Sequence, residues 1–300
     1  MTKQILVAAI AAAFTGLTGA TASAAVTGFS IANVILGFNA TAGQGLTSAL
    51  EVSIGSAASF RDTTSNIPNI ISLGSILSST YGANWFERTD LFFGLGTTTS
   101  NILPTNDPTL VNGDPGQTIY LSKSRLTGGN ELLANSTITT PNNTTIGNSS
   151  GNLLNLQNSF VTNGTGTVIG GVGGVSVIPE STFNTFEDFA AGNIQFSFVQ
   201  SGGVVQAFGT GTRTGFSSPG VEGALDLFRF QRANNLPGQY REGQPNLTPF
   251  YEGFFTIDNG GNLSFQVAPL AAIPEPSMLV AGLIPLVGMA LRRRRSVVAA

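Results

Sequence analysis

The densest group of aromatic and charged residues in the chain contains Trp85, Glu87 and Asp90. An aromatic ring beside two carboxylates can bind a sugar, because the ring stacks on the pyranose while the acids accept hydrogen bonds from its hydroxyl groups. Two acids are also the minimum for glycoside hydrolysis. A structural interpretation fits the same residues: Trp85 and Phe86 anchor a helix to a sheet, and Arg88 pairs with a carboxylate. Both interpretations stay open at the level of sequence.

The chain contains no cysteine and no histidine. The first absence excludes a disulfide framework, a thiol nucleophile and a thiolate metal site. The second excludes Ser-His-Asp and Cys-His catalysis and histidine-ligated zinc or iron. Residues 258–262, Asp-Asn-Gly-Gly-Asn, offer oxygen ligands but lack the spacing and the distal Glu of an EF-hand, so they predict a turn. We therefore assign no catalytic residue, no cofactor and no metal.

Net charge argues against a nucleic-acid partner. Between the two terminal segments described below, eight basic residues face 15 acidic ones, which leaves a net charge of −7. A chain without a basic patch cannot release counterions from a phosphate backbone. The acidic, Ser/Thr/Asn/Gly-rich composition is typical of an extracellular protein.

Short alternating runs of β-branched and aromatic residues, bounded by Gly, Asn or Pro, dominate the chain. This pattern predicts an all-β fold, and about 250 residues can form one large β-domain or two smaller ones. We expect a secreted domain over residues 25–270, built as a β-sandwich or jelly-roll-like fold. The expected strands are residues 29–38, 49–54, 91–95, 118–122, 167–177, 193–199, 204–209, 224–230, 253–257 and 263–267.

Three short helices interrupt the strand pattern. Apolar residues recur at helical spacing in residues 70–81, 151–160 and 182–191. We expect these helices to be lids or crossovers on the sheet. The polar segments 97–115 and 137–150 predict loops.

The N-terminus has the features of an export signal. Lys3 precedes an apolar stretch, and the small-residue sequence around Ala22 and Ala24 predicts cleavage before Ala25. An Ala-Thr-Ala sequence just upstream offers an alternative cleavage point. We therefore expect residues 1–24 to be a Sec-type signal peptide.

The C-terminus combines a rigid motif, an apolar run and a cationic end. Pro274, Glu275 and Pro276 predict an extended, accessible segment, because each proline fixes φ and disfavours helix in the residue before it. The apolar run, residues 278–291, has 14 residues. As a helix it reaches roughly 21 Å, against a hydrocarbon core of about 30 Å, so it is a marginal membrane span.

Four arginines follow the apolar run, and they predict which side of the membrane the chain occupies. Under the positive-inside rule they remain cytoplasmic, which places everything before the motif on the other side. The residues of this cytoplasmic stop are Arg292, Arg293, Arg294 and Arg295.

Residues 271–300 resemble the PEP-CTERM sorting signal of Gram-negative, biofilm-forming bacteria. The resemblance rests on Pro274-Glu275-Pro276, on the short apolar helix and on the arginine cluster; Pro285 within the helix and the extra residues 296–300 depart from the pattern. It implies recognition by an exosortase, an integral-membrane cysteine protease or transpeptidase, after transient insertion into the inner membrane. It also implies export to the cell surface, often alongside exopolysaccharide.

Two functions from different classes fit these observations. The first is a non-enzymatic surface or matrix protein that associates with exopolysaccharide, with exosortase and the Sec machinery as its partners. The second is a carboxylate-based glycan hydrolase. An open groove with two carboxylates about 5 to 9.5 Å apart would favour the enzyme.

Overall fold

The computed structural model describes residues 30–100, 113–125, 127–128, 143–163, 167–169, 172–179, 186, 205–207, 216, 220–231 and 249–268. The expected signal peptide and sorting signal lie outside these residues. So do the expected strand 193–199 and, apart from Phe186, the expected helix 182–191. Within the described part of the chain, no helix has both the length and the hydropathy needed to cross a membrane.

The described residues form one 11-stranded sheet with three α-helices and a 3-10 turn. The strands are paired in the order β3-β11-β10-β9-β5-β4-β1-β2-β7-β6, with β8 also paired to β4. Every pairing recorded among them is antiparallel. The elements are β1 (Asn33–Ala40), β2 (Ser48–Ser56), α1 (Ala57–Arg61), β3 (Ile67–Ser72), α2 (Gly74–Tyr81), η1 (Trp85–Glu87), β4 (Leu91–Thr98), β5 (Ile119–Ser124), α3 (Asn143–Asn163), β6 (Thr167–Ile169), β7 (Val172–Pro179), β8 (Val205–Ala207), β9 (Val221–Phe230), β10 (Phe250–Asp258) and β11 (Asn262–Val267).

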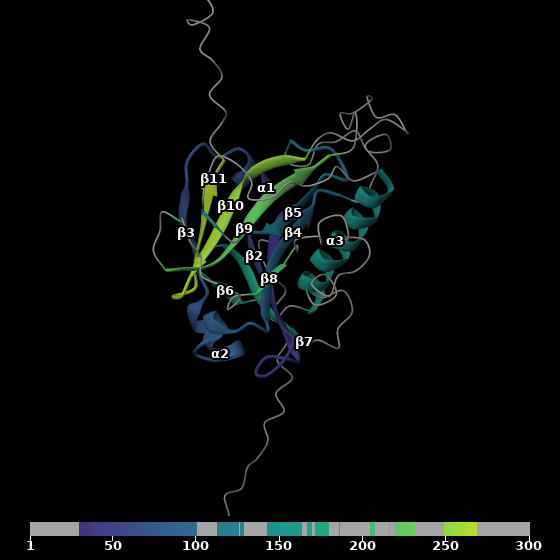
Figure 1. Cartoon of the computed structure of the whole chain (residues 1–300). Coiled ribbons are helices and arrows are strands. Elements are labelled where there is room, and N and C mark those ends of the chain that lie inside the picture. The colour runs from purple at the N-terminus through teal and green to yellow at the C-terminus, as the bar shows by residue number, and fades with distance from the viewer. Residues whose placement is uncertain are drawn as a thin grey trace, which may run out of the picture.

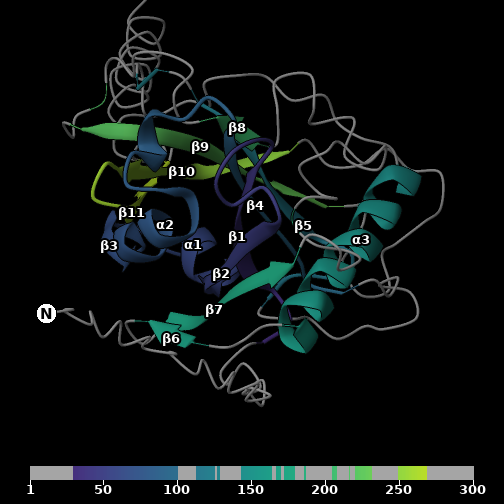
Figure 2. The ribbon, with the colours of Figure 1, turned by 90° about the horizontal axis from the view of Figure 1, so that it is seen from below.

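The sheet is curled (Figures 1 and 2), and the larger of its two apolar cores lies inside the curl. Helix α1 follows β2 directly, yet its Phe60 packs edge-on against Phe255 of β10 and Phe265 of β11, with centroids 5.0 and 5.2 Å apart. In a flat sheet, strands spaced about 4.8 Å apart would hold β2 and β11 far from each other. The two halves of the sheet therefore face each other across one core, which α1 and α2 help to fill.

Helix α3 covers part of the other face of the sheet, on the side away from α1 and α2 (Figure 2). Ile146, Leu153 and Phe160 are fully buried there against Ile119 and Leu121 of β5. These helix positions are seven residues apart, so they form one apolar stripe along the helix. A smaller second core lies between α3 and the sheet.

The all-β class predicted from the sequence is confirmed. The described strands belong to one curled sheet, which encloses a core much as a sandwich does with two separate sheets. The expected hairpin at the end of the domain is also confirmed, since β10 and β11 pair directly. Its turn closes when the backbone N–H of Asn262 donates to Asp258 Oδ1 over 2.8 Å.

Two local predictions are wrong. Residues 143–150, expected to be part of a polar loop, are the first part of α3. Their polar character has a structural cause: Ser150 hydrogen-bonds Thr98 over 2.7 Å and Gln157 donates to Thr97 over 2.6 Å, so the interface between α3 and β4 is partly polar. The expected helix 70–81 begins only at residue 74, because the isoleucines before it pair with β11 as strand β3.

Candidate functional site

The cluster expected to contact glycan is packed as a structural anchor. Trp85, in η1, is only 1% exposed and makes an edge-on contact with Phe86 at 5.7 Å between centroids. Its buried indole presents no open face to a sugar. Glu87 is exposed and Asp90 is partly exposed, so the two carboxylates reach the surface without the Trp85 ring as a stacking platform.

Arg88, at the centre of this cluster, ties three segments together. Its guanidinium forms two hydrogen bonds with the Asp90 carboxylate, at 3.0 and 2.6 Å. It also donates to the carbonyl oxygens of Ala42, Gln44 and Tyr81 at 2.5, 2.6 and 2.8 Å. The hydrogen bond from Arg88 holds the pKa of Asp90 below its ordinary value. These contacts agree with the structural interpretation of the cluster, in which Arg88 pairs with a carboxylate.

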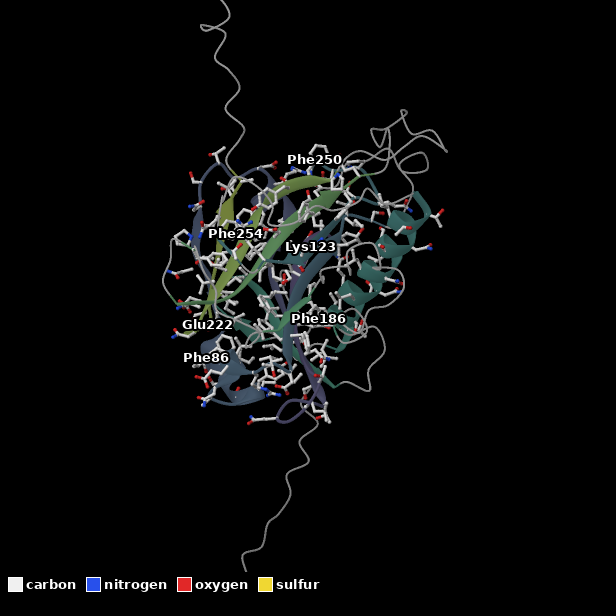
Figure 3. The ribbon with its side chains drawn as sticks, in the orientation of Figure 1. Phe86, Lys123, Phe186, Glu222, Phe250 and Phe254 are labelled. Carbon is white, nitrogen blue, oxygen red and sulfur yellow. The ribbon has the colours of Figure 1, made fainter. Side chains whose placement is uncertain are left out.

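A second polar cluster lies at the opposite end of the molecule, and we call it the charged rim. It surrounds the start of β10, near Phe250, whereas Phe86 lies beside α2 at the other end (Figure 3). Its members come from α1, the segment before β5, and strands β5, β9 and β10 with the residue after β9. They are Arg61, Asp62, Asp114, Tyr120, Arg229, Gln231, Phe250 and Glu252.

Asp114 is the hub of the charged rim. Its carboxylate, 2% exposed, forms an ion pair with Arg61 at 2.6 Å and accepts hydrogen bonds from Tyr120 at 2.5 Å, Arg229 at 3.2 Å and Gln231 at 3.1 Å. A buried carboxylate loses its hydration, and these four donors compensate its charge for that loss. Burial and the nearby Asp114 charge together raise the pKa of the Tyr120 phenol. Asp114 is therefore the centre of a polar network in which each of these donors compensates its buried charge.

A β-bulge places Glu252 in the rim. Tyr251 pairs with Phe228 and Gly253 with Leu227, so Glu252 is an extra residue on the β10 side. Gly253 has φ +139°, and a Cβ there would lie 2.2 Å from a backbone oxygen, so only glycine fits. Bulges redirect side chains at sheet rims. Here the bulge brings the Glu252 carboxylate to 2.6 Å from Arg229 Nε.

Arg229 connects the hub, the bulge and an exposed ring. Its guanidinium contacts Asp114 and Glu252 and lies 4.5 Å from the centroid of the Phe250 ring. Burial raises the pKa of Glu252 above its ordinary value, and the charge of Arg229 opposes that shift. The rim therefore combines an aromatic ring with carboxylates, the residue types that the sequence suggested at Trp85.

The sequence could not reveal the charged rim, because its members are spread over almost two hundred positions. Its five charged members lie in four separate segments of the chain, with only Arg61 and Asp62 adjacent, and they form no recognisable motif. The one local signal is Gly253 beside Glu252 within an aromatic strand, since an isolated glycine in a strand often marks a bulge. The pairing of β5, β9 and β10 then brings the members together.

Glu51 is a buried acid on the α3 side of the sheet. Its side chain is fully buried; Oε1 accepts a hydrogen bond from the backbone N–H of Phe186 over 2.7 Å, and Oε2 has no hydrogen-bond partner among the residues that the structure describes. Burial raises its pKa to about 8. The Phe186 ring occupies the space above Gly37, the cross-strand neighbour of Glu51, where a Cβ would come within 2.0 Å of the ring.

A buried ion pair lies on the same face in the other half of the sheet. Arg125 and Asp226 are both fully buried and 2.7 Å apart, and the Arg125 guanidinium stacks 4.3 Å from the centroid of Phe254. Lys123 is the cross-strand neighbour of Asp226, and burial lowers its pKa. Together these groups hold β5, β9 and β10 in register.

The described residues contain no group of three or more acidic, histidine or cysteine side chains placed to hold a metal ion. The tail residues Pro274, Glu275 and Pro276, with the four arginines after them, lie outside the described residues, as do Ala22, Ala24 and Ala25. Comparison with family models, with curated proteins and with solved structures finds no match to this chain.

Proposed function

We propose that the chain is a non-enzymatic surface or extracellular-matrix protein of a Gram-negative bacterium, exported through Sec and sorted at its C-terminus by an exosortase. Polysaccharide of the surrounding matrix is its partner. The observation that carries this proposal is the order of the last residues: Pro274-Glu275-Pro276, a 14-residue apolar run, then four arginines. A stop-transfer element needs this order.

The fold is compatible with processing at both ends. The first described strand begins at Asn33, after the proposed cleavage before Ala25, and the last ends at Val267, before Pro274. Removal of both signals would leave every described strand in place. A sheet stabilised without a single cysteine also needs no disulfide chemistry after export.

The ion pairs of two described carboxylates, Asp90 and Asp114, support the non-enzymatic form of the proposal. A glycoside hydrolase uses one acid as proton donor and a second as base or nucleophile. Asp90 is instead clamped by Arg88, and Asp114 accepts three hydrogen bonds and forms an ion pair with Arg61. Carboxylates held in this way stabilise a structure.

Three tail variants and one lysine control, expressed in a host with the sorting enzyme, test the proposal. Replacing residues 292–295 by Ser removes the stop, since each arginine costs about 2.5 to 3.5 kcal/mol at the bilayer centre. That chain should be released unprocessed, whereas a variant with four lysines should be processed like the parent. Glu275→Ala or Pro276→Ala should instead accumulate in the inner membrane with an intact C-terminus, as intact-mass analysis would show. Trimming of every variant like the parent would refute the sorting signal.

A further inference from the structure

The charged rim has an exposed surface that its internal contacts do not use. Phe250 is 39% exposed, one of four large apolar side chains exposed among the described residues. Arg229 lies over one face of the ring, so the other face is the one left for a ligand to stack on. Asp62, which pairs with Arg61 in the same rim, is 61% exposed, while Arg229 and Glu252 retain 17% and 10%.

An unused donor and an unused acceptor lie next to this ring. Arg229 donates through Nε and Nη1, and its Nη2 forms no hydrogen bond with any described residue. Glu252 accepts through Oε1, and its Oε2 likewise has no partner among the described residues. Neither atom is sealed from solvent as a buried unpaired group. Arg229 Nη2 and Glu252 Oε2 can together bind one hydroxyl group, because a hydroxyl accepts one hydrogen bond and donates another.

The charge of the rim selects the class of ligand. Two arginines and three carboxylates give it a net charge of −1, within a domain that is itself acidic. A polyanion would be repelled, and the arginines are already engaged by carboxylates. An uncharged polyhydroxyl chain can place its C–H face on the ring and its hydroxyl groups on Arg229 and Glu252.

We propose that the charged rim is a binding site for a neutral polysaccharide, with Phe250 as the stacking platform and Arg229 and Glu252 as the hydroxyl-binding pair. The inference rests on the proposed function in taking a matrix polysaccharide as the partner. The site lies at the start of β10, away from the C-terminal signal in sequence. Binding can therefore be measured whether or not the chain is sorted.

The test uses the full-length chain in a detergent without a sugar headgroup. Affinity electrophoresis in gels containing dextran, galactomannan or xyloglucan measures binding to neutral glycans, and alginate serves as the polyanion. The parent should be retarded by at least one neutral glycan and not by alginate. Phe250→Ala should weaken that retardation about tenfold, the loss of one good contact. Phe250→Trp should restore it, and Leu46→Ala, at an equally exposed apolar residue outside the rim, should change nothing.

A second variant separates binding from stability. Glu252→Gln keeps the shape of the side chain but removes the charge that positions Arg229, and it should weaken glycan retardation while Phe250 remains exposed. Thermal denaturation of each variant shows whether it is folded. Retardation by alginate alone, no retardation by any of the three neutral glycans, or a folded Phe250→Ala that binds like the parent would each overturn the inference. None of these results bears on the C-terminal masses that test sorting.

Discussion

Glu51 gives the sharpest prediction about stability, because it is an acid held without a counter-charge in the second core. Strands β1 and β7, which flank it in the sheet, and helix α3, which lies on the same face, contain no charged residue. Its one hydrogen bond, from the N–H of Phe186, favours the ionised form but does not offset the loss of hydration. The folded protein should therefore keep Glu51 protonated at neutral pH.

The magnitude follows from the two states of this carboxyl group. Its pKa is about 8 in the folded chain against an ordinary value of 4.5. Between these values the unfolded chain is ionised and the folded chain is protonated, so the free energy of unfolding falls as pH rises, by up to about 1.4 kcal/mol per pH unit. The stability is complete below pH 4.5 and is lost by about pH 8. Between pH 5 and pH 8 the loss attributable to Glu51 is about 3 to 4 kcal/mol.

Replacing Glu51 by Gln should remove this dependence. The amide oxygen can still accept the hydrogen bond from Phe186, but the side chain cannot ionise. Urea unfolding of parent and variant at several pH values from 5 to 8 should give curves that diverge, with the variant more stable at the alkaline end. Other titrating groups are common to both proteins and cancel in the difference. A curve for Glu51→Gln that runs parallel to that of the parent would refute the reasoning.

Two further predictions concern the packing of single residues. Arg88→Lys should lower the free energy of unfolding by about 1 to 3 kcal/mol, because one ammonium group cannot reproduce a planar fork that binds Asp90 and three carbonyls; an unchanged thermal midpoint would contradict this. Gly37→Ala should cost about 1 to 3 kcal/mol, since its Cβ would enter the Phe186 ring. Gly151→Ala in α3, whose Cβ would meet nothing within 4 Å, should instead stabilise the chain by up to about 1 kcal/mol. Equal effects of the two alanines in thermal denaturation would show that the ring does not occupy this space.

The strands were the predictable part of this fold, because alternation is a local property. Residues 91–95 and 263–267 alternate between the core and the opposite face, and each lies within an observed strand. The curl of the sheet is not local. It depends on Phe60 reaching β10 and β11, about two hundred residues further along the chain. Period-2 patterning contains no information about such a contact.

Helix α3 shows how a polar composition can mislead. Its first turns read as loop because Ser, Thr and Asn dominate them, and such residues compete with the helix backbone for hydrogen bonds. In the fold, Ser150 and Gln157 bind the threonines of β4 instead. Tertiary hydrogen bonds thus override a weak local preference, and only the partner strand makes them visible.

The candidate site found in the structure differs from the one that the sequence suggested, for a related reason. The sequence suggested a sugar site at Trp85 because two acids follow it closely in the chain. In the structure Trp85 is buried in the core, and its neighbour Arg88 fixes the surrounding segments. An exposed ring beside an ion pair requires strands that converge from different parts of the chain. Arg229 and Phe250 are paired across β9 and β10, and the bulge at Glu252 adds the carboxylate. The residues of such a surface group become neighbours only through the pairing of antiparallel strands. The register of the strands therefore has to be known before the group can be recognised.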